Sequence, residues 1–266
     1  MSALSDLLPP EAIRLDIRAA DWKHAVRDAG DLLVATGTST AAYTDEMIRN
    51  VEENGPYLVI APGFAFAHAR PSPAVRRTGM SWVRLAEPVD FGHETNDPVT
   101  LVVALAATDA AAHTAAMASL ARLLGDPETS RALHEAPTPT ALHAVLARQD
   151  DVRPVQQAAP AAPAQDRPAA PGMHKILTVC GNGVGTSLFL KNTLEQVLDR
   201  WKWSRFVTVE ATDTISAKGK ASEAVAILTS REIARTLGDV GVPVKVVEDF
   251  TSTTEVDGVL RDTYDV

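Results

Sequence analysis

The segment from residue 150 to residue 172, DDVRPVQQAAPAAPAQDRPAAPG, limits how this chain can fold. It holds five of the chain's 17 prolines, is rich in alanine and glutamine, and has no aromatic residue. Such a composition cannot bury enough apolar surface to order itself, and proline favours an extended spacer. A surface loop of this length inside one domain would be unusual. The sequence therefore predicts two domains, residues 1–149 and 173–266, joined by a flexible linker.

Composition narrows the class of protein. The chain has 266 residues, 45% of them hydrophobic, so each predicted domain can bury its own core. A net charge of −9 argues against nucleic acid or an anionic membrane surface as the main partner. A single cysteine cannot form an internal disulfide, which favours the reducing cytoplasm. No apolar run is long enough to span a bilayer, and no signal-peptide pattern is present, so no membrane insertion is expected.

The second half alternates strand and helix patterns in a regular way. Strands are predicted in 174–180, 205–211, 223–230 and 242–249, and helical segments in 187–201, 214–222, 231–241 and 254–264. This alternation predicts a small, four-stranded parallel sheet with helices on both faces, a Rossmann-like α/β fold. Ligands of such sheets collect at the carboxyl ends of the strands, and Cys180 stands at the end of the first strand.

The first half mixes both kinds of element without a strict repeat. Helices are predicted in 21–37, 41–55, 110–126 and 139–149, and extended segments in 56–71, 79–91 and 98–108. Asp109 is expected to cap the third of these helices. We therefore expect a mixed α/β domain, in which helices cover a mixed sheet.

The stretch CGNGVGTS, residues 180–187, has the composition of a phosphate-binding loop. Its glycines let successive backbone N–H groups turn inward, and the helix that follows adds a partial positive charge. We expect this field to lower the pKa of Cys180, and Thr186 and Ser187 to cap the helix. A buried cysteine beside an ordinary turn is the alternative. The candidate phosphate-binding residues are Gly181, Asn182, Gly183, Val184, Gly185, Thr186 and Ser187.

Several enzyme classes use comparable loops, and the sequence disfavours most of them. A phosphatase of the tyrosine-phosphatase type needs an arginine where Thr186 stands, because a guanidinium clamps the phosphoryl oxygens. No Gly-Lys-Ser/Thr ending and no complete dinucleotide-binding glycine pattern are present. A cysteine that receives phosphate and passes it on fits better.

A phosphocysteine needs a donor, and phosphohistidine is a suitable one. His68 ends the stretch APGFAFAHARP, and Arg70 follows it as a candidate for pairing with phosphoryl oxygens. His113 falls near the start of a predicted helix, where the backbone favours an anion. Sequence spacing does not bring these two histidines together. We expect ordinary surface roles for His24, His134 and His143, a structural role for His93, and neither a metal site nor a cofactor.

These motifs resemble a known family. The chain is similar to a fused IIA–IIB component of the bacterial phosphoenolpyruvate-dependent sugar phosphotransferase system (PTS), of the ascorbate-type branch. The first half resembles the IIA domains of the mannitol/fructose superfamily in NGPYLVIAPGFAFAHARP, VDFGHETNDPV and AATDAAAHTAAMASLARLL. The second half resembles the IIB domain in its VCGNGxGxS loop. Ala67 stands where the family usually has proline.

The resemblance implies a phosphoryl relay in sugar uptake, and hence a phosphotransferase. Phospho-HPr would phosphorylate His68 with His113 beside it, and Cys180 would then carry the phosphate to a sugar held by a membrane IIC permease. An ascorbate-like acid or a polyol is the substrate class implied. A regulatory module that senses sugar flux without transport is the alternative. The resemblance leaves the oligomeric state open, a homodimer being one of the states it allows.

Overall fold

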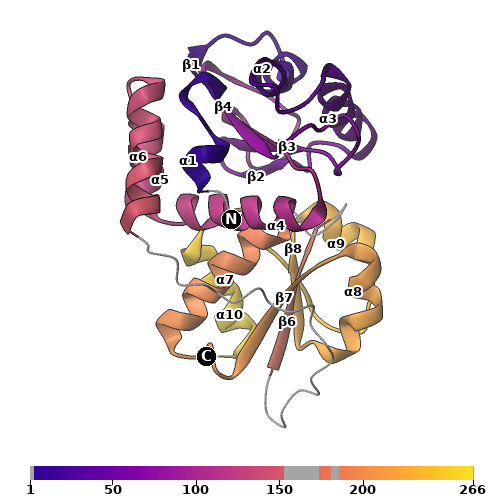
Figure 1. The fold of residues 1–266 in the computed structure, drawn as a ribbon. Coiled ribbons are helices and arrows are strands. Elements are labelled where there is room, and N and C mark those ends of the chain that lie inside the picture. The colour runs from indigo at the N-terminus through magenta and orange to yellow at the C-terminus, as the bar shows by residue number, and fades with distance from the viewer. Residues whose placement is uncertain (1–2, 153–173, 181–185, 266) are drawn as a thin grey trace.

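The computed structural model describes residues 3–152, 174–180 and 186–265 (Figure 1). In the first half, the described residues form a mixed five-stranded sheet in the order β1-β4-β5-β3-β2. Its strands β1 and β4 are parallel, as are β3 and β5, whereas β4 and β5, and β2 and β3, are antiparallel. The strands are β1 (Ile13–Ile17), β2 (Val59–Ala61), β3 (Phe64–His68), β4 (Gly79–Val89) and β5 (Val99–Ala106).

Helices cover both faces of this sheet. One face packs against α2 (Trp22–Ala35) and α3 (Ala41–Asn54), whose apolar side chains share a core with Ala65 and Ala67. The other face packs against a second group of helices, which share a core with Phe64 and Phe66. The second group consists of α1 (Leu4–Leu7), α4 (Ala110–Leu124), α5 (Pro127–Glu135) and α6 (Pro139–Val152), with the short 3-10 helix η1 (Pro10–Ala12) beside them.

The two-residue period of β3 decides where its functional side chain points. Because successive strand residues face opposite sides of a sheet, Phe64, Phe66 and His68 share one face, while Ala65 and Ala67 share the other. His68 therefore lies on the α4 side of the sheet, at the end of the strand.

The second half has the parallel fold that its alternating pattern predicts. Its described strands form a four-stranded sheet in the order β7-β6-β8-β9, with every neighbouring pair parallel. Helices α7 and α10 share a core on one face, and α8 and α9 pack on the other. The elements are β6 (His174–Cys180), α7 (Ser187–Trp201), β7 (Val207–Asp213), α8 (Thr214–Lys220), η2 (Ala221–Glu223), β8 (Ala226–Thr229), α9 (Arg231–Leu237), β9 (Val244–Val246) and α10 (Thr253–Tyr264).

The predicted fold class of both halves is confirmed, but some elements differ from the prediction. Strand β1 and helices α1 and α5 were not predicted. Asp109 caps α4 as expected, its carboxylate accepting the N–H of Ala112 at 2.8 Å. Helix α6 continues to Val152, so residues 150–152 of the segment predicted as linker are helical. The rest of that segment, up to residue 172, lies outside the described residues.

The two halves pack directly against each other, and α4 lies next to α7 at their junction (Figure 1). Phe189 of α7 brings its ring to 5.5 Å from that of Phe66 and 6.3 Å from that of Phe64, measured between ring centroids. The amide of Phe250 donates to the carbonyl of Ile60 at 3.1 Å. Within the described residues, no helix is long and apolar enough to cross a membrane.

Candidate active site

Sheet topology brings His68 and His113 together. Strands β3 and β5 are parallel neighbours, and His68 pairs with Leu105 near the end of β5. Helix α4 begins four residues after β5 ends, so His113 returns to the edge at which β3 ends. The two imidazole rings lie 5.5 Å apart, centroid to centroid. The expected pair of histidines is thus adjacent in space, for a reason that only the strand order supplies.

His68 is held as a neutral imidazole in a defined tautomer. Its side chain is buried, and its Nδ1 lies 3.0 Å from the carbonyl oxygen of Phe66. Since a carbonyl can only accept, Nδ1 carries the proton and Nε2 keeps its lone pair. Burial, together with the nearby His113, lowers the pKa of His68 to about 4, against the attraction of the Phe66 carbonyl. At neutral pH, Nε2 is therefore available as a nucleophile.

His113 presents a polar atom with no partner in the protein. Its Nδ1 is buried and makes no hydrogen bond to any described residue. Burial also lowers the pKa of this imidazole, so it is neutral near pH 7. A buried nitrogen without a partner is costly unless a ligand satisfies it. Its position beside His68 suits a group that contacts a phosphoryl group on that residue.

Tyr43 fixes the backbone immediately after His68. Its buried hydroxyl accepts the N–H of Ala69 at 3.0 Å and donates to the carbonyl of Leu105 at 2.8 Å. These two bonds tie the end of β3 to the end of β5. Burial raises the pKa of Tyr43, so its hydroxyl remains protonated as this arrangement requires.

Cys180 stands at the carboxyl end of β6, as predicted, but its environment differs from the expectation. It is buried, and its Sγ donates to Ser187 Oγ at 3.4 Å. Burial raises the pKa of the thiol, although hydrogen bonds with Ser187 and Thr186 act in the opposite direction. The predicted lowering of the Cys180 pKa is therefore wrong for the packed arrangement of the two halves, because removal from water outweighs the local hydrogen bonds.

The predicted capping of α7 by side chains is also wrong. Thr186 occupies the N-cap position, but its side chain makes no capping hydrogen bond. The hydroxyl of Thr178 on β6 instead donates to the carbonyl of Ser187 at 3.0 Å and ties the helix start to the strand. Gly181, Asn182, Gly183, Val184 and Gly185 lie outside the described residues.

Tyr57 lies beside both predicted phosphoryl carriers, and sequence reasoning missed it. Its ring meets that of His68 edge-on at 6.2 Å between centroids. It also lines a pocket at the junction of the two halves, together with Cys180, Thr186, Ile60 and His93. Burial, and to a smaller extent the nearby Cys180, raises the pKa of Tyr57 to about 12, against a hydrogen bond with Asn50. Its phenol is therefore a hydrogen-bond donor near neutral pH.

The remaining candidates have less to do with this site. Arg70 is exposed, and no hydrogen bond or ion pair joins its side chain to another described residue. His24 pairs with Asp21 at 2.8 Å, while His134 and His143 contact backbone carbonyls at 2.9 and 3.2 Å. No group of three or more potential metal-ligating side chains occurs among residues 3–152, 174–180 and 186–265.

Comparison with known families identifies the first half. A family model described as "Phosphoenolpyruvate-dependent sugar phosphotransferase system, EIIA 2" matches residues 6–149, which is more than half of the chain. The chain belongs to this family. A second model, described as "PTS system, Lactose/Cellobiose specific IIB subunit", matches residues 175–262. This PTS protein therefore joins a IIA part and a IIB part in one chain, and it is a phosphotransferase of the phosphoryl relay in sugar uptake.

Relatives of this PTS protein match its IIA part. It is 42% identical over 113 residues to the "Ascorbate-specific PTS system EIIA component" of Escherichia coli K12, covering 42% of this chain and 73% of the relative. It is 43% identical over 110 residues to the component of the same name from Salmonella paratyphi A, covering 41% and 71%. The solution structure of the mannitol-specific cryptic phosphotransferase enzyme IIA CmtB from E. coli superposes with a TM-score of 0.51 at 31% identity, covering 55% of this chain and 99% of that one.

Proposed function

We propose that one phosphoryl group passes from phospho-HPr to His68 Nε2, next to Cys180 Sγ, and finally to a sugar held by a membrane IIC permease. The packing of the two halves supports this order, because Tyr57, whose ring contacts that of His68, also lines the pocket that Cys180 lines. Such a chain would meet all of these partners in the cytoplasm. The two halves would act as a phosphohistidine domain, residues 1–149, and a phosphocysteine domain, residues 173–266, with residues 150–172 as the tether.

The first transfer would use the tautomer described above. The lone pair of Nε2 attacks the phosphorus while the bond between phosphorus and the donor nitrogen breaks. Nδ1 keeps its proton and continues to donate it to the Phe66 carbonyl. His113 would contact the incoming phosphoryl oxygens through the nitrogen that has no protein partner. Arg70 is exposed, so we assign it the lesser role of attracting the anionic donor.

The second transfer would break the N–P bond of phospho-His68 and form an S–P bond at Cys180. The Cys180 thiol loses its proton to water as Sγ attacks the phosphorus, and neutral imidazole leaves with its proton still on Nδ1. We propose that the Tyr57 phenol, whose ring contacts His68 and lines the same pocket as Cys180, donates to the phosphoryl oxygens during this step. We propose that residues 181–187 then receive the negative charge through their backbone N–H groups, with Ser187 Oγ beside the sulfur.

The substrate class is proposed from the relatives of the IIA part. The names of these relatives specify ascorbate, which favours an ascorbate-like acid over other sugars. The family description of the IIB part names lactose and cellobiose, and this makes a neutral disaccharide the competing class. Uptake of labelled ascorbate by cells that carry this chain and its permease, compared with uptake of labelled cellobiose, separates the two.

Phosphorylation with defined components tests the relay. Incubation of the chain with phosphoenolpyruvate, enzyme I and HPr should label His68 and Cys180. The Cys180→Ser variant should retain label on His68, whereas His68→Gln should abolish labelling at both positions. Acid lability distinguishes phosphohistidine from phosphocysteine, and mass spectrometry assigns each position. Label on Cys180 in the His68→Gln chain would contradict the proposed order.

A further inference from the structure

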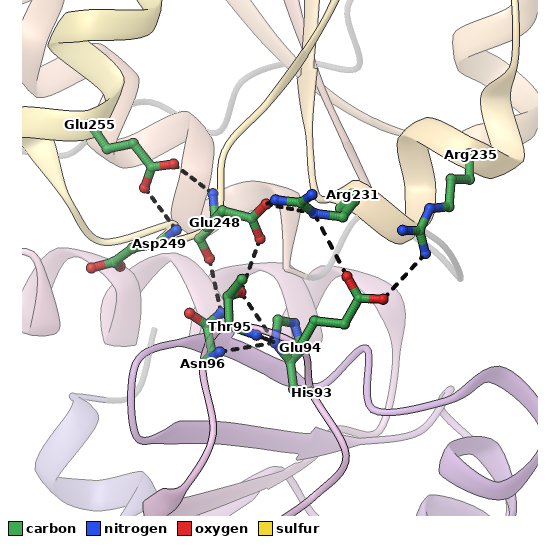
Figure 2. Close-up of polar contacts among 9 residues, drawn as sticks. All are labelled: His93, Glu94, Thr95, Asn96, Arg231, Arg235, Glu248, Asp249 and Glu255. Carbon is green, nitrogen blue, oxygen red and sulfur yellow. Dashed lines mark hydrogen bonds and ion pairs between the residues drawn. The ribbon is translucent and has the colours of Figure 1, made fainter.

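Among the residues that the structure describes, a short loop of the IIA part makes most of the polar contacts with the IIB part. This docking loop, residues 93–96, follows β4 and faces the corner that follows β9 (Figure 2). The Asn96 side-chain amide donates to the carbonyl of Glu248 at 2.9 Å, and the Thr95 hydroxyl donates to its carboxylate at 3.1 Å. Both backbone and side chain of one IIB residue are thus bound by the docking loop.

The docking loop is shaped by contacts within the IIA part. His93 Nδ1 accepts the backbone N–H groups of Thr95 at 3.3 Å and of Asn96 at 3.1 Å. One carboxylate oxygen of Asp97 accepts the N–H groups of His93 and Phe91, at 2.7 and 3.0 Å. The loop therefore has its docking shape without help from the IIB part, which reduces the entropy lost on association.

The facing corner of the IIB part is prepared in a comparable way. The carboxylate of Glu255 accepts the N–H of Glu248 at 2.7 Å and the N–H of Asp249 at 2.9 Å (Figure 2). The guanidinium of Arg231 donates to the Glu248 carboxylate through Nε at 2.9 Å. These bonds orient Glu248 toward Thr95 and Asn96.

Opposite charges flank this contact. Glu94 of the docking loop lies 4.0 Å from Arg231 and 3.6 Å from Arg235, both on α9 (Figure 2). All three side chains remain partly exposed to solvent, so these pairs add little to the stability of the fold. Charges at the rim of an interface act mainly on the rate of encounter and on the choice of partner.

We infer that the docking loop is the specificity element by which the IIA part selects its IIB part. Thr95 and Asn96 bind Glu248, Glu94 supplies the charge that Arg231 and Arg235 recognise, and His93 is a positioning residue that holds the loop in shape. This inference rests on the proposed relay, since docking serves transfer from His68 to Cys180.

Transfer between two full-length chains tests the inference. The donor is the Cys180→Ser chain loaded with labelled phosphate on His68, and the acceptor is the His68→Gln chain. Glu94→Arg in the donor should raise the KM for the acceptor three- to tenfold and leave kcat within about twofold. Arg235→Glu in the acceptor, which leaves the bond between Arg231 and Glu248 intact, should do the same. Combining the two changes should restore KM to within about twofold, because the charges are then opposite again.

The matched control is Glu53→Arg in the donor, which makes the same charge change at an exposed position of α3. It should leave KM unchanged. The effect of Glu94→Arg should shrink as salt is raised above about 0.1 M, where charges are screened beyond about 10 Å. Equal KM values for Glu94→Arg and Glu53→Arg, with wild-type transfer intact, would overturn the docking inference while leaving the relay standing.

Two further measurements complete the test. His93→Ala should raise KM at constant kcat, and His93→Asn should recover most of the loss, because its side-chain oxygen can accept the same amides. Amide hydrogen exchange of the full chain does not depend on transfer. Exchange at Phe250, whose amide donates to the Ile60 carbonyl across the junction, should be faster in Glu94→Arg than in Glu53→Arg, and equal exchange would contradict the inference even if no phosphoryl transfer were observed.

Discussion

At the scale of single residues, the state of His68 follows from its burial. A neutral imidazole with its proton fixed on Nδ1 by the Phe66 carbonyl keeps a lone pair on Nε2, as the proposed attack on a phosphoryl group requires. The same burial makes protonation of this side chain costly, so the stability of the fold depends on pH through this residue.

We expect acid to destabilise the protein through His68. Its pKa is about 4 in the folded chain and near 6.5 when unfolded, so the unfolded state binds the proton first as pH falls. The free energy of unfolding is unaffected by protonation of this residue above pH 6.5. Between pH 6.5 and 4 it falls by about 1.4 kcal/mol per pH unit, or ~3 kcal/mol in all. Urea unfolding of the wild type and of His68→Gln at pH 7.5 and 4.5 measures it. Stability differences between the two proteins that do not change with pH would contradict this assignment.

Tyr57→Phe should separate the two transfer steps. Removing the hydroxyl leaves the ring beside His68 but takes away the donor to the phosphoryl oxygens, so transfer from His68 to Cys180 should slow about tenfold or more. Loading of His68 from phospho-HPr should change less than threefold. Rapid-quench measurement of label on each residue gives both rates. A variant that slows loading and transfer equally would indicate that Tyr57 supports the fold around His68 instead.

The site could be predicted in part from the sequence. The glycine-rich loop after Cys180 and the proline-flanked stretch ending at His68 carry local signals that do not need a structure. His113 lies beside His68 because strands β3 and β5 are parallel neighbours, and no local sequence pattern encodes that pairing. The role of Tyr57 and the raised pKa of Cys180 both arise where the two halves pack, so neither could be read from the residues of one half.

At the scale of elements, α7 links the two halves through an aromatic contact. Phe189 stands in the first turn of this helix, a few residues from Cys180, and packs against Phe64 and Phe66 of the strand that ends in His68. The same helix therefore supports the thiol at its start and contacts the histidine strand, which couples docking to the approach of the two reactive groups.

Phe189→Ala should weaken this coupling. Loss of a buried phenyl ring costs about 3 kcal/mol or more in a packed core, and the cavity here would open at the junction of the two halves. Calorimetry should show the two halves unfolding in transitions that are further apart than in the wild type. Phe206→Ala, at a ring 49% exposed, is the control and should change stability by less than about 1 kcal/mol. Equal thermograms for both variants would show that Phe189 does not couple the halves.

Strongly periodic elements were the ones that could be predicted. The apolar runs of β6 and β5 and the amphipathic helices α2 and α7 match the structure closely. Strand β1 was missed because its five residues, IRLDI, include two charged side chains, and it is an edge strand recognised only by its pairing with β4. Helix α5 is short and begins with Asp126 and Pro127, which indicate a turn as readily as a helix start.

At the scale of the whole molecule, the covalent connection of the two halves should affect the rate of transfer between them most when the protein is dilute. A protease site placed within residues 153–173 allows the connection to be cut after folding. Because a tether keeps its two ends at an effective concentration near millimolar, cutting should slow transfer at about 1 μM protein at least tenfold. Raising the concentration of the cut protein should recover the rate. Transfer that is equally fast before and after cutting at 1 μM would remove the kinetic reason for fusing the halves.

The burial of His68 has a consequence for the rate of phosphoryl transfer through the proposed relay. With the halves packed together, 8% of this residue is accessible to solvent, so under the proposed relay an upstream donor protein would require the halves to separate before it reached Nε2. Phosphorylation of His68 by the donor and transfer from His68 to Cys180 would then have to alternate, one in the separated and the other in the packed state. Under the proposed relay, the lifetime of the packed state would limit turnover, so an interface that dissociated too slowly would reduce sugar uptake as much as one that never formed.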